Sequence, residues 1–321
     1  MLLARHQMKP IFILSLLILV LSCRDHKKTM TGQQYFTTAD SVRIMYVDKG
    51  DPDKTPIIFL QGSDGTSFEW QVFTERLKDK YRLILFDRRG NGLSTRLLPG
   101  HKLTMEAYLN DIAGLQQKMG IKKCVILGWS FGGAVAAEYA LKYPDKVSSL
   151  ILVNPLSDAN QLWIDRAEAI YPVALKNNDT LALKTIDKLK KGNSLTIEDE
   201  YEIVKVQNAV WYNKATADSF YTKTDVKLYG YTDSTLSTDW ENLIAQKKIY
   251  DGYSNLNRIS KINCPTLIIG GTHDHIISPA QCEKIHALIP ASKMKIIQNS
   301  GHLPFIEKPD ELEVILTGFI K

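Results

Sequence analysis

Seven short runs rich in Val, Ile and Leu recur along the chain and constrain its fold more than any other feature. Several are continuously apolar, which is typical of strands buried on both faces of a parallel sheet covered by helices. Helices are predicted at 104–119 and 131–142, and Ser278-Pro279 marks another helix start with the serine as N-cap. The sequence therefore predicts an α/β fold with strands at 42–47, 56–60, 82–86, 124–127, 149–153, 266–270 and 295–297.

The alternation stops between about Pro155 and Ile262, where no good strand run occurs. This stretch is rich in Lys and Glu and contains Trp163, Trp211 and Trp240. We expect a helical insertion at 156–262 that packs over the strand ends and buries part of its aromatic surface. The core would then be formed by residues 35–155 and 263–321.

The N-terminal segment has the pattern of a targeting sequence. Arg5, His6 and Lys9 precede an apolar run at 11–21, which is too short to span a bilayer as a mature helix. The following V-L-S-C resembles a bacterial lipobox, with Leu21 bulkier than the usual residue. We expect residues 1–22 to be a lipoprotein-type signal peptide, Cys23 to carry the lipid, and 23–34 to form a tether. The alternatives are an ordinary secretion signal and an uncleaved anchor.

These features imply a protein of the bacterial cell envelope, lipid-anchored to a membrane and facing the periplasm or the surface. The net charge is only +5 and no dense basic stripe occurs, so nucleic acid is not an expected partner. Three further cysteines are irregularly spaced and do not describe a disulfide framework. Cys124 opens an apolar strand as a core residue, whereas an oxidising compartment would allow a Cys264–Cys282 disulfide.

The stretch G-W-S-F-G at 128–132 lies between a predicted strand and a predicted helix. In such a sharp turn the serine takes a strained backbone conformation, and side chains at the two flanking glycines would collide. A serine hydroxyl needs a base, and the base needs an orienting group. Asp274 and His302 each lie just past the end of a predicted strand. Since the ends of parallel strands meet at one sheet edge, Ser130 could meet both residues there.

The chain resembles the α/β-hydrolase family from about Tyr35 to Lys321. Four stretches carry the resemblance: the elbow L-G-W-S-F-G-G, F-D-R-R-G-N-G-L-S (86–94), G-T-H-D-H-I-I-S-P (271–279), and S-G-H-L-P-F-I-E-K-P (300–309). The resemblance implies an eight-stranded, mostly parallel sheet flanked by helices, with a helical cap inserted after the sixth strand. It also implies Ser130 as nucleophile, His302 as general base and then acid, and Asp274 as the carboxylate that orients the imidazole.

The oxyanion loop departs from the family pattern. In L-Q-G-S-D-G-T-S (60–67), Gln61 replaces the usual histidine and Asp64 stands where proline is common. Because an oxyanion hole uses backbone N–H groups, we expect Ser63 and Phe131 to supply the donors, although a carboxylate at Asp64 would oppose negative charge there.

Three other features have simpler interpretations. No cofactor or metal is expected: His273 and His275 flank Asp274, but alternating side chains cannot all face one ion. Asp87 is interpreted as a loop-organising residue, and Glu138 as a surface residue.

These residues favour a serine hydrolase that cleaves a small-molecule carboxylic ester or related acyl bond through an acyl-enzyme. A serine nucleophile argues against epoxide-opening and dehalogenating relatives. One alternative is an aminopeptidase resembling proline iminopeptidases, whose F-D-Q-R-G-x-G-x-S motif is similar to 86–94. Such an enzyme needs cap acids for the substrate amine, and the candidates are Asp165, Glu168, Glu198, Asp199 and Glu200. A lactonase or carbon–carbon bond hydrolase with the same triad, and a binding protein without activity, remain open.

Overall fold

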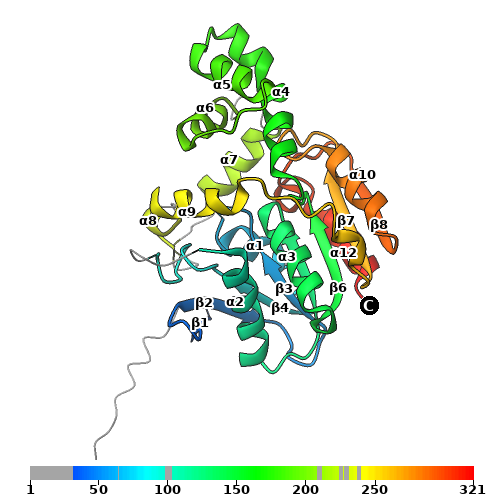
Figure 1. Cartoon of the computed structure of the whole chain (residues 1–321). Helices are drawn as coiled ribbons and strands as arrows, with labels where there is room; N and C mark the ends of the chain where they lie inside the picture. The colour runs from blue at the N-terminus through cyan, green and yellow to red at the C-terminus, as the bar shows by residue number, and fades with distance from the viewer. Residues whose placement is uncertain are drawn as a thin grey trace, which may run out of the picture.

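The computed structural model describes residues 32–63, 65–97, 103–207, 212–223, 227, 231–236 and 240–321. Its centre is one eight-stranded sheet in the order β1-β2-β4-β3-β5-β6-β7-β8 (Figure 1). The β1–β2 and β2–β4 pairs are antiparallel, and all other neighbours are parallel. The strands are β1 Gln33–Thr37, β2 Arg43–Lys49, β3 Pro56–Leu60, β4 Arg82–Phe86, β5 Cys124–Trp129, β6 Val147–Val153, β7 Thr266–Gly271 and β8 Ser292–Ile297.

This sheet confirms the predicted mostly parallel α/β architecture. The central strands β3, β5 and β7 are almost wholly buried, as expected of continuously apolar strands covered on both faces. The sequence predicts no strand at β1 and places Gln33 and Gln34 in the tether. Both residues instead pair with Val47 and Tyr46 of β2.

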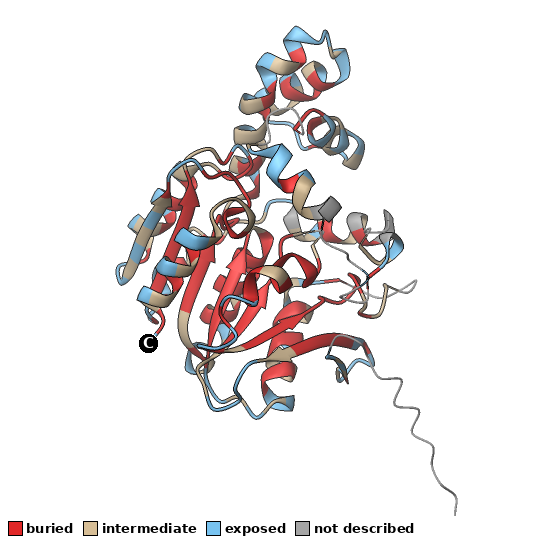
Figure 2. Ribbon diagram, turned by 180° about the vertical axis from the view of Figure 1, so that it is seen from behind, coloured by how far each residue is buried: buried red, intermediate tan, exposed pale blue. Residues whose placement is uncertain are grey.

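Helices cover both faces of the sheet (Figures 1 and 2). One face packs against α2 Met105–Lys118, α3 Phe131–Lys142 and α10 Pro279–Leu288, and the other packs against α1 Phe68–Thr74 and α12 Pro309–Phe319. A short helix, α11 Pro304–Glu307, precedes α12. Ser278 takes the predicted N-cap position of α10, but its hydroxyl does not cap the helix. It donates instead to Asp165 Oδ2 at 2.7 Å, so the expected capping bond is wrong.

The chain between β6 and β7 forms helices α4 Ala159–Lys176, α5 Thr180–Lys190, α6 Ile197–Gln207, α7 Lys214–Lys223, α8 Asp233–Leu236 and α9 Trp240–Tyr250. Helices α4, α5 and α6 project away from the sheet in Figure 1. They enclose a small core of their own that includes Ile170, Ile186 and Ile203. No described helix is long and apolar enough to cross a bilayer. Residues 1–31 lie outside the described part, so the signal peptide and Cys23 lipidation stay predictions.

Candidate active site

Ser130 occupies a strained turn between β5 and α3. Its backbone angles are φ 56° and ψ −122°, a conformation that side-chain-bearing residues rarely adopt. A Cβ atom at Gly128 would lie 2.2 Å from the Gly132 carbonyl oxygen, and one at Gly132 would lie 2.4 Å from the Leu60 carbonyl oxygen. Both flanking positions therefore require glycine, as the sequence predicts, and the tight turn holds Ser130 at the sheet edge.

Asp274 and His302 come together from loops that follow β7 and β8. His302 Nδ1 lies 2.7 Å from Asp274 Oδ2, and both side chains are buried. The other carboxylate oxygen accepts backbone N–H bonds from Ile276 at 2.8 Å and Ile277 at 3.0 Å. Burial alone would raise the pKa of Asp274, but the charge and hydrogen bond of His302 and these N–H donors outweigh it, so its pKa lies below the ordinary value. The structure therefore holds an ionised carboxylate against the imidazole.

A residue with no predicted role also contacts this pair. Asn154, directly after β6, has φ 44° and is fully buried. Its side-chain amide donates to Asp274 Oδ2 and to the Gly301 carbonyl oxygen, the latter at 3.1 Å. Asn154 thereby ties the ends of three strands together. The positive φ favours Asn among residues with side chains, but this gives no sufficient signal in the sequence.

Trp129 connects His302 to the elbow. Its indole Nε1 donates to the His302 carbonyl oxygen at 2.8 Å, and the two ring centroids are 5.3 Å apart. Because Trp129 directly precedes Ser130, this contact brings the His302 ring to the side of the elbow. Asp274 and His302 also line a small separate cavity together with Tyr212, whose ring stacks on His273 at 4.4 Å.

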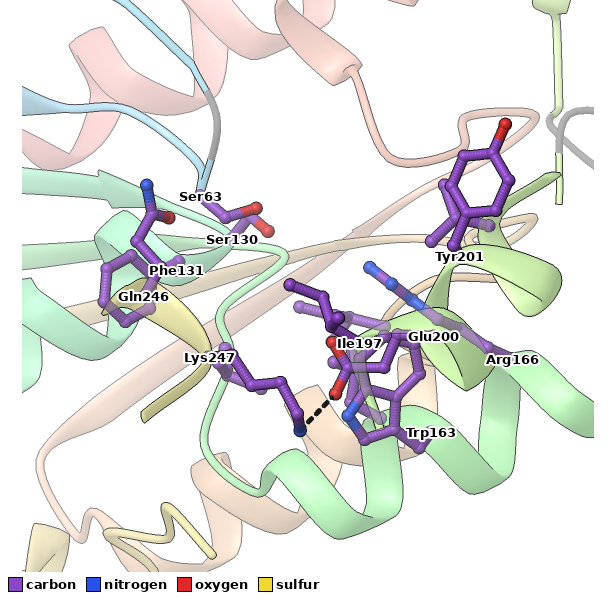
Figure 3. A pocket seen from close by; sticks show the side chains of 14 residues that line it. Ser63, Ser130, Phe131, Trp163, Arg166, Ile197, Glu200, Tyr201, Gln246 and Lys247 are labelled. Atoms are coloured by element: carbon purple, nitrogen blue, oxygen red, sulfur yellow. Dashed lines mark hydrogen bonds and ion pairs between the residues drawn. The ribbon is translucent and has the colours of Figure 1, made fainter. Parts of the chain in front are cut away.

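A cavity of about 230 Å³ opens at Ser130. Ser63, Ser130 and Phe131 lie at one end, and side chains from α4, α6 and α9 form much of the remaining wall (Figure 3). Ser63 and Phe131, the predicted oxyanion donors, therefore border the same space as Ser130. The insertion contributes apolar, polar and three charged side chains to the lining: Leu156, Leu162, Trp163, Arg166, Ile197, Glu200, Tyr201, Val204, Gln246 and Lys247.

The loop at 61–67 is held by Arg88, another residue with no predicted role. The Arg88 side chain is almost fully buried, and its Nη2 donates to the carbonyl oxygens of Gly62 and Ser63, the latter at 2.5 Å. Its guanidinium also lies over the Phe131 ring, 4.9 Å from the centroid. Since C=O and N–H point in opposite directions across a trans peptide, binding of the Gly62 carbonyl directs the Ser63 N–H away from Arg88.

Neighbouring residues of the 86–94 motif brace the same loop. Asn91 Nδ2 donates to the Gly65 carbonyl oxygen at 3.0 Å, and Asp87 Oδ1 accepts the Ser67 N–H at 2.7 Å. Asp87 Oδ2 accepts the Leu93 N–H at 2.7 Å, so Asp87 organises the loops as predicted.

Two predicted departures from the family pattern lie in this loop. Gln61 is fully buried, and neither atom of its amide has a partner among the described residues. Asp64, the residue expected to oppose negative charge, lies outside the described residues.

Of the five candidate acids for an amine site, Glu200 is the one that lines the cavity at Ser130. Asp165 accepts hydrogen bonds from Ser278 and Gln281, Asp199 pairs with Lys188, and Glu168 and Glu198 are exposed. Sequence alone could not separate them, because helix packing decides which acid faces inward.

The remaining predictions differ in outcome. No group of three metal-ligand side chains occurs among the described residues. Cys124, Cys264 and Cys282 are buried and free, so the structure contains no Cys264–Cys282 disulfide. Glu138 is not the surface residue expected, since it is largely buried and pairs with Arg258 and the Tyr253 hydroxyl. Glu138 lies on α3, and both of its partners lie in the segment between α9 and β7.

Comparison with known proteins identifies the family. The sequence model of the alpha/beta hydrolase fold family matches residues 55–309, which is most of the chain. A proline iminopeptidase of Lactobacillus helveticus (strain DPC 4571) is 27% identical over 274 residues, covering 84% of this chain and 90% of that protein. Epoxide hydrolase 3 of Xenopus tropicalis is 24% identical over 299 residues, covering 89% of this chain and 77% of that protein. The solved structure of a thermophilic esterase from Thermogutta terrifontis matches with a TM-score of 0.65 at 25% identity, and the match covers 89% of this chain and 97% of the esterase. The chain belongs to the α/β-hydrolase fold family and is a hydrolase.

Proposed function

We propose that this hydrolase cleaves a carboxylic ester or related acyl bond of a small molecule, with Ser130 as nucleophile. The proposal rests on the strained elbow that presents Ser130 to a cavity, together with the buried Asp274–His302 pair, which Trp129 links to the elbow. In this mechanism Ser130 Oγ attacks the acyl carbon while His302 removes its proton. Because Nδ1 of His302 is bonded to Asp274, Nε2 is the nitrogen left for proton transfer.

The rest of the cycle follows from the same groups. Negative charge that develops on the carbonyl oxygen is received by the backbone N–H groups of Ser63 and Phe131. The tetrahedral intermediate then collapses, and His302 gives its proton to the leaving alkoxide. Water, deprotonated by His302, attacks the acyl-enzyme and releases the acid. Asp274 holds the imidazole in the required tautomer and stabilises the imidazolium.

Replacing Ser130 tests the proposal. We expect Ser130→Ala to lower ester turnover by about 10⁴-fold or more and to abolish labelling by a fluorophosphonate probe, while the circular dichroism spectrum is unchanged. Ser148→Ala is a suitable control, since Ser148 lies on β6 and its hydroxyl has no partner among the described residues. Retention of most activity in Ser130→Ala would rule out the assigned nucleophile.

The similarity to proline iminopeptidases supports a second candidate, an aminopeptidase on the same triad. Glu200 is the described acid that could receive a substrate amine in the cavity, but Lys247 Nζ already lies 2.7 Å from its carboxylate. A cationic amine would have to displace this lysine. Turnover of prolyl and alanyl amides, measured beside that of short-chain esters, separates the two candidates. The serine at the elbow remains an argument against the epoxide chemistry named for the Xenopus relative.

A further inference from the structure

The cavity at Ser130 has two chemically different ends. In Figure 3, Ser130, Ser63, Phe131 and Gln246 lie together on one side, whereas Arg166 and Glu200 lie on the opposite side. Apolar side chains line the cavity along with these polar groups. A ligand that fills this space therefore meets a reactive group at one end, apolar walls along its length and charges at the far end.

At the charged end of the cavity, the acid Glu200 already has a cationic partner. Glu200 on α6 and Lys247 on α9 form an ion pair at 2.7 Å, and both side chains are only 15% exposed. Lys247 also pairs with Asp251, whose side chain does not line the cavity and is 57% exposed to solvent. The negative charge of Glu200 is thus balanced within the cavity wall, since paired charges largely cancel at a distance.

Arg166 adds a second cation to this wall. It lies on α4, three residues after Trp163, and its guanidinium is 4.9 Å from the centroid of the Trp163 ring. Figure 3 shows the guanidinium directed into the cavity. Arg166 and Lys247 are the described cations of the lining and Glu200 is its described anion, so the lining as a whole is positive. A guanidinium carries five N–H donors in a planar fork that matches a carboxylate.

Gln246 gives independent evidence that the cavity receives a polar ligand. Its side chain is 1% exposed, and neither Oε1 nor Nε2 has a hydrogen-bond partner among the described residues. An unbonded buried amide costs free energy, which a ligand with polar atoms near the reactive end would recover. The ester group itself could supply those atoms.

We propose that the acyl substrate carries an anionic group, a carboxylate, at the end of an apolar chain, and that Arg166 binds this group. The inference rests on the proposed function, because it assigns the ends of a substrate whose acyl carbon lies at Ser130. Glu200 sets the strength of the preference, because it neutralises Lys247, which would otherwise add to the attraction of the lining for the substrate carboxylate. The same arrangement disfavours a substrate with a terminal ammonium group.

Three series of para-nitrophenyl esters test this preference. Their acyl chains are matched in length and end in a carboxylate, a methyl group or an ammonium group. For the purified protein we expect kcat/KM to be highest for the carboxylate series, by about tenfold over the methyl series. A hydrogen bond to a charged group contributes enough free energy to change a binding constant by roughly tenfold or more. Arg166→Gln should remove that preference mainly through KM, and Arg166→Lys should keep part of it.

Glu200→Gln supplies the opposite test, because removing the anion should increase the carboxylate preference. Lys191→Gln is the matched control: it removes a charge from an exposed lysine outside the cavity and should leave the ratio unchanged. Equal kcat/KM for the carboxylate and methyl series, or a ratio that neither Arg166→Gln nor Glu200→Gln alters, would overturn the inference while Ser130-dependent hydrolysis still supported the proposed function.

A binding measurement keeps the two proposals separate. Dicarboxylate monoamides should raise the melting temperature more than the corresponding diamides, and Arg166→Gln should abolish the difference. That result would support anion binding even if no ester were hydrolysed. No stabilisation by the carboxylates would count against it, whatever the hydrolytic activity.

Discussion

The two sides of Ser130 are built differently. The Asp–His side consists of Asp274, His302 and Asn154, and the loop side consists of residues 61–67 with Glu69 and Arg88. On the Asp–His side, the Asp274 carboxylate accepts bonds from an imidazole, an amide and two backbone N–H groups. All the described contacts of this carboxylate are therefore with groups that can donate to it.

Buried polar atoms on the loop side are less well matched. Gln61 has no partner for its amide among the described residues, and Arg88 Nε and Nη1 have none there either. The described hydrogen bonds of the Arg88 guanidinium go to the carbonyl oxygens of Gly62 and Ser63. The loop side thus buries a cation whose hydrogen-bonding capacity is only partly used.

This contrast indicates where the electrostatic demands of the site lie. On the Asp–His side the Asp274 carboxylate is satisfied before any substrate binds, and so it fixes geometry, although Asn154 Oδ1 has no hydrogen-bond partner among the described residues. A buried cation such as Arg88 is costly unless negative charge lies near it. In the proposed acyl transfer, negative charge that develops beside Ser63 and Phe131 would meet that condition.

Among changes on the two sides of Ser130, Asp274→Asn should have the largest effect on activity. It removes the charge that holds the imidazole tautomer, and we expect kcat to fall by about 10³–10⁴-fold with little change in KM. Ester kinetics measure the loss, and thermal unfolding checks that the variant is folded. Asp187→Asn, at an exposed position on α5, is the control. A loss below about tenfold would mean that the Asp–His side does not act in catalysis.

The two sides also differ in how far the sequence could predict them. Ser130, Asp274 and His302 each stand in a local motif at a strand end, so sheet topology predicts all three at one edge of the sheet, where the structure pairs Asp274 with His302. The contact of Arg88 with the Gly62 carbonyl depends on how two loops pack, 26 residues apart in the chain, and no local pattern encodes it. Arg88 is also adjacent to Arg89 in the sequence, and Arg89 pairs with Asp40 and Asp111. The sequence alone does not show which of the two arginines contacts the loop.

The same distinction holds for the fold. Buried central strands are predictable because continuous apolar runs specify them. Strand β8 is predicted only at 295–297, whereas it spans Ser292–Ile297 with alternating exposure, as an edge strand with one wetter face. Strand β1, QQYFT, is short and polar and pairs only with β2, so its sequence carries little strand signal. In the insertion, helix packing alone determines that Glu200 faces the cavity.

Arg88→Met should have the next largest effect. Without the guanidinium the Gly62 carbonyl is no longer held, the Ser63 N–H loses its direction, and we expect kcat to fall by about 10–10²-fold. Arg89→Met is a matched control on the adjacent residue: it breaks a buried ion pair and should lower the melting temperature, while the folded fraction keeps its kcat. If both variants lost stability alone, with kcat unchanged, the loop side would be structural only.

Glu69→Gln should have the smallest effect on activity but a clear effect on stability against pH. Burial raises the pKa of Glu69 to about 8, although Glu69 accepts the Thr66 N–H at 2.9 Å. The folded protein therefore keeps this proton up to about pH 8, whereas the unfolded chain releases it near the ordinary pKa of 4.5, so the stability of the unaltered protein falls as pH rises between these values. The glutamine variant lacks this loss and should be the more stable by about 1–3 kcal/mol above pH 8, with no gain at acid pH.

Melting temperatures at about pH 5 and about pH 9 measure this difference. Glu75→Gln is the opposite control, because bonds from Lys49 and Lys78 outweigh burial and lower the pKa of Glu75, so its removal should not stabilise the protein at alkaline pH. Equal melting temperatures for Glu69→Gln and the unaltered protein at about pH 9 would show that Glu69 is not a buried acid held in its neutral form. The contrast between the two sides would then rest on Arg88 and Gln61, because the loop side would no longer contain a carboxyl group that opposes ionisation.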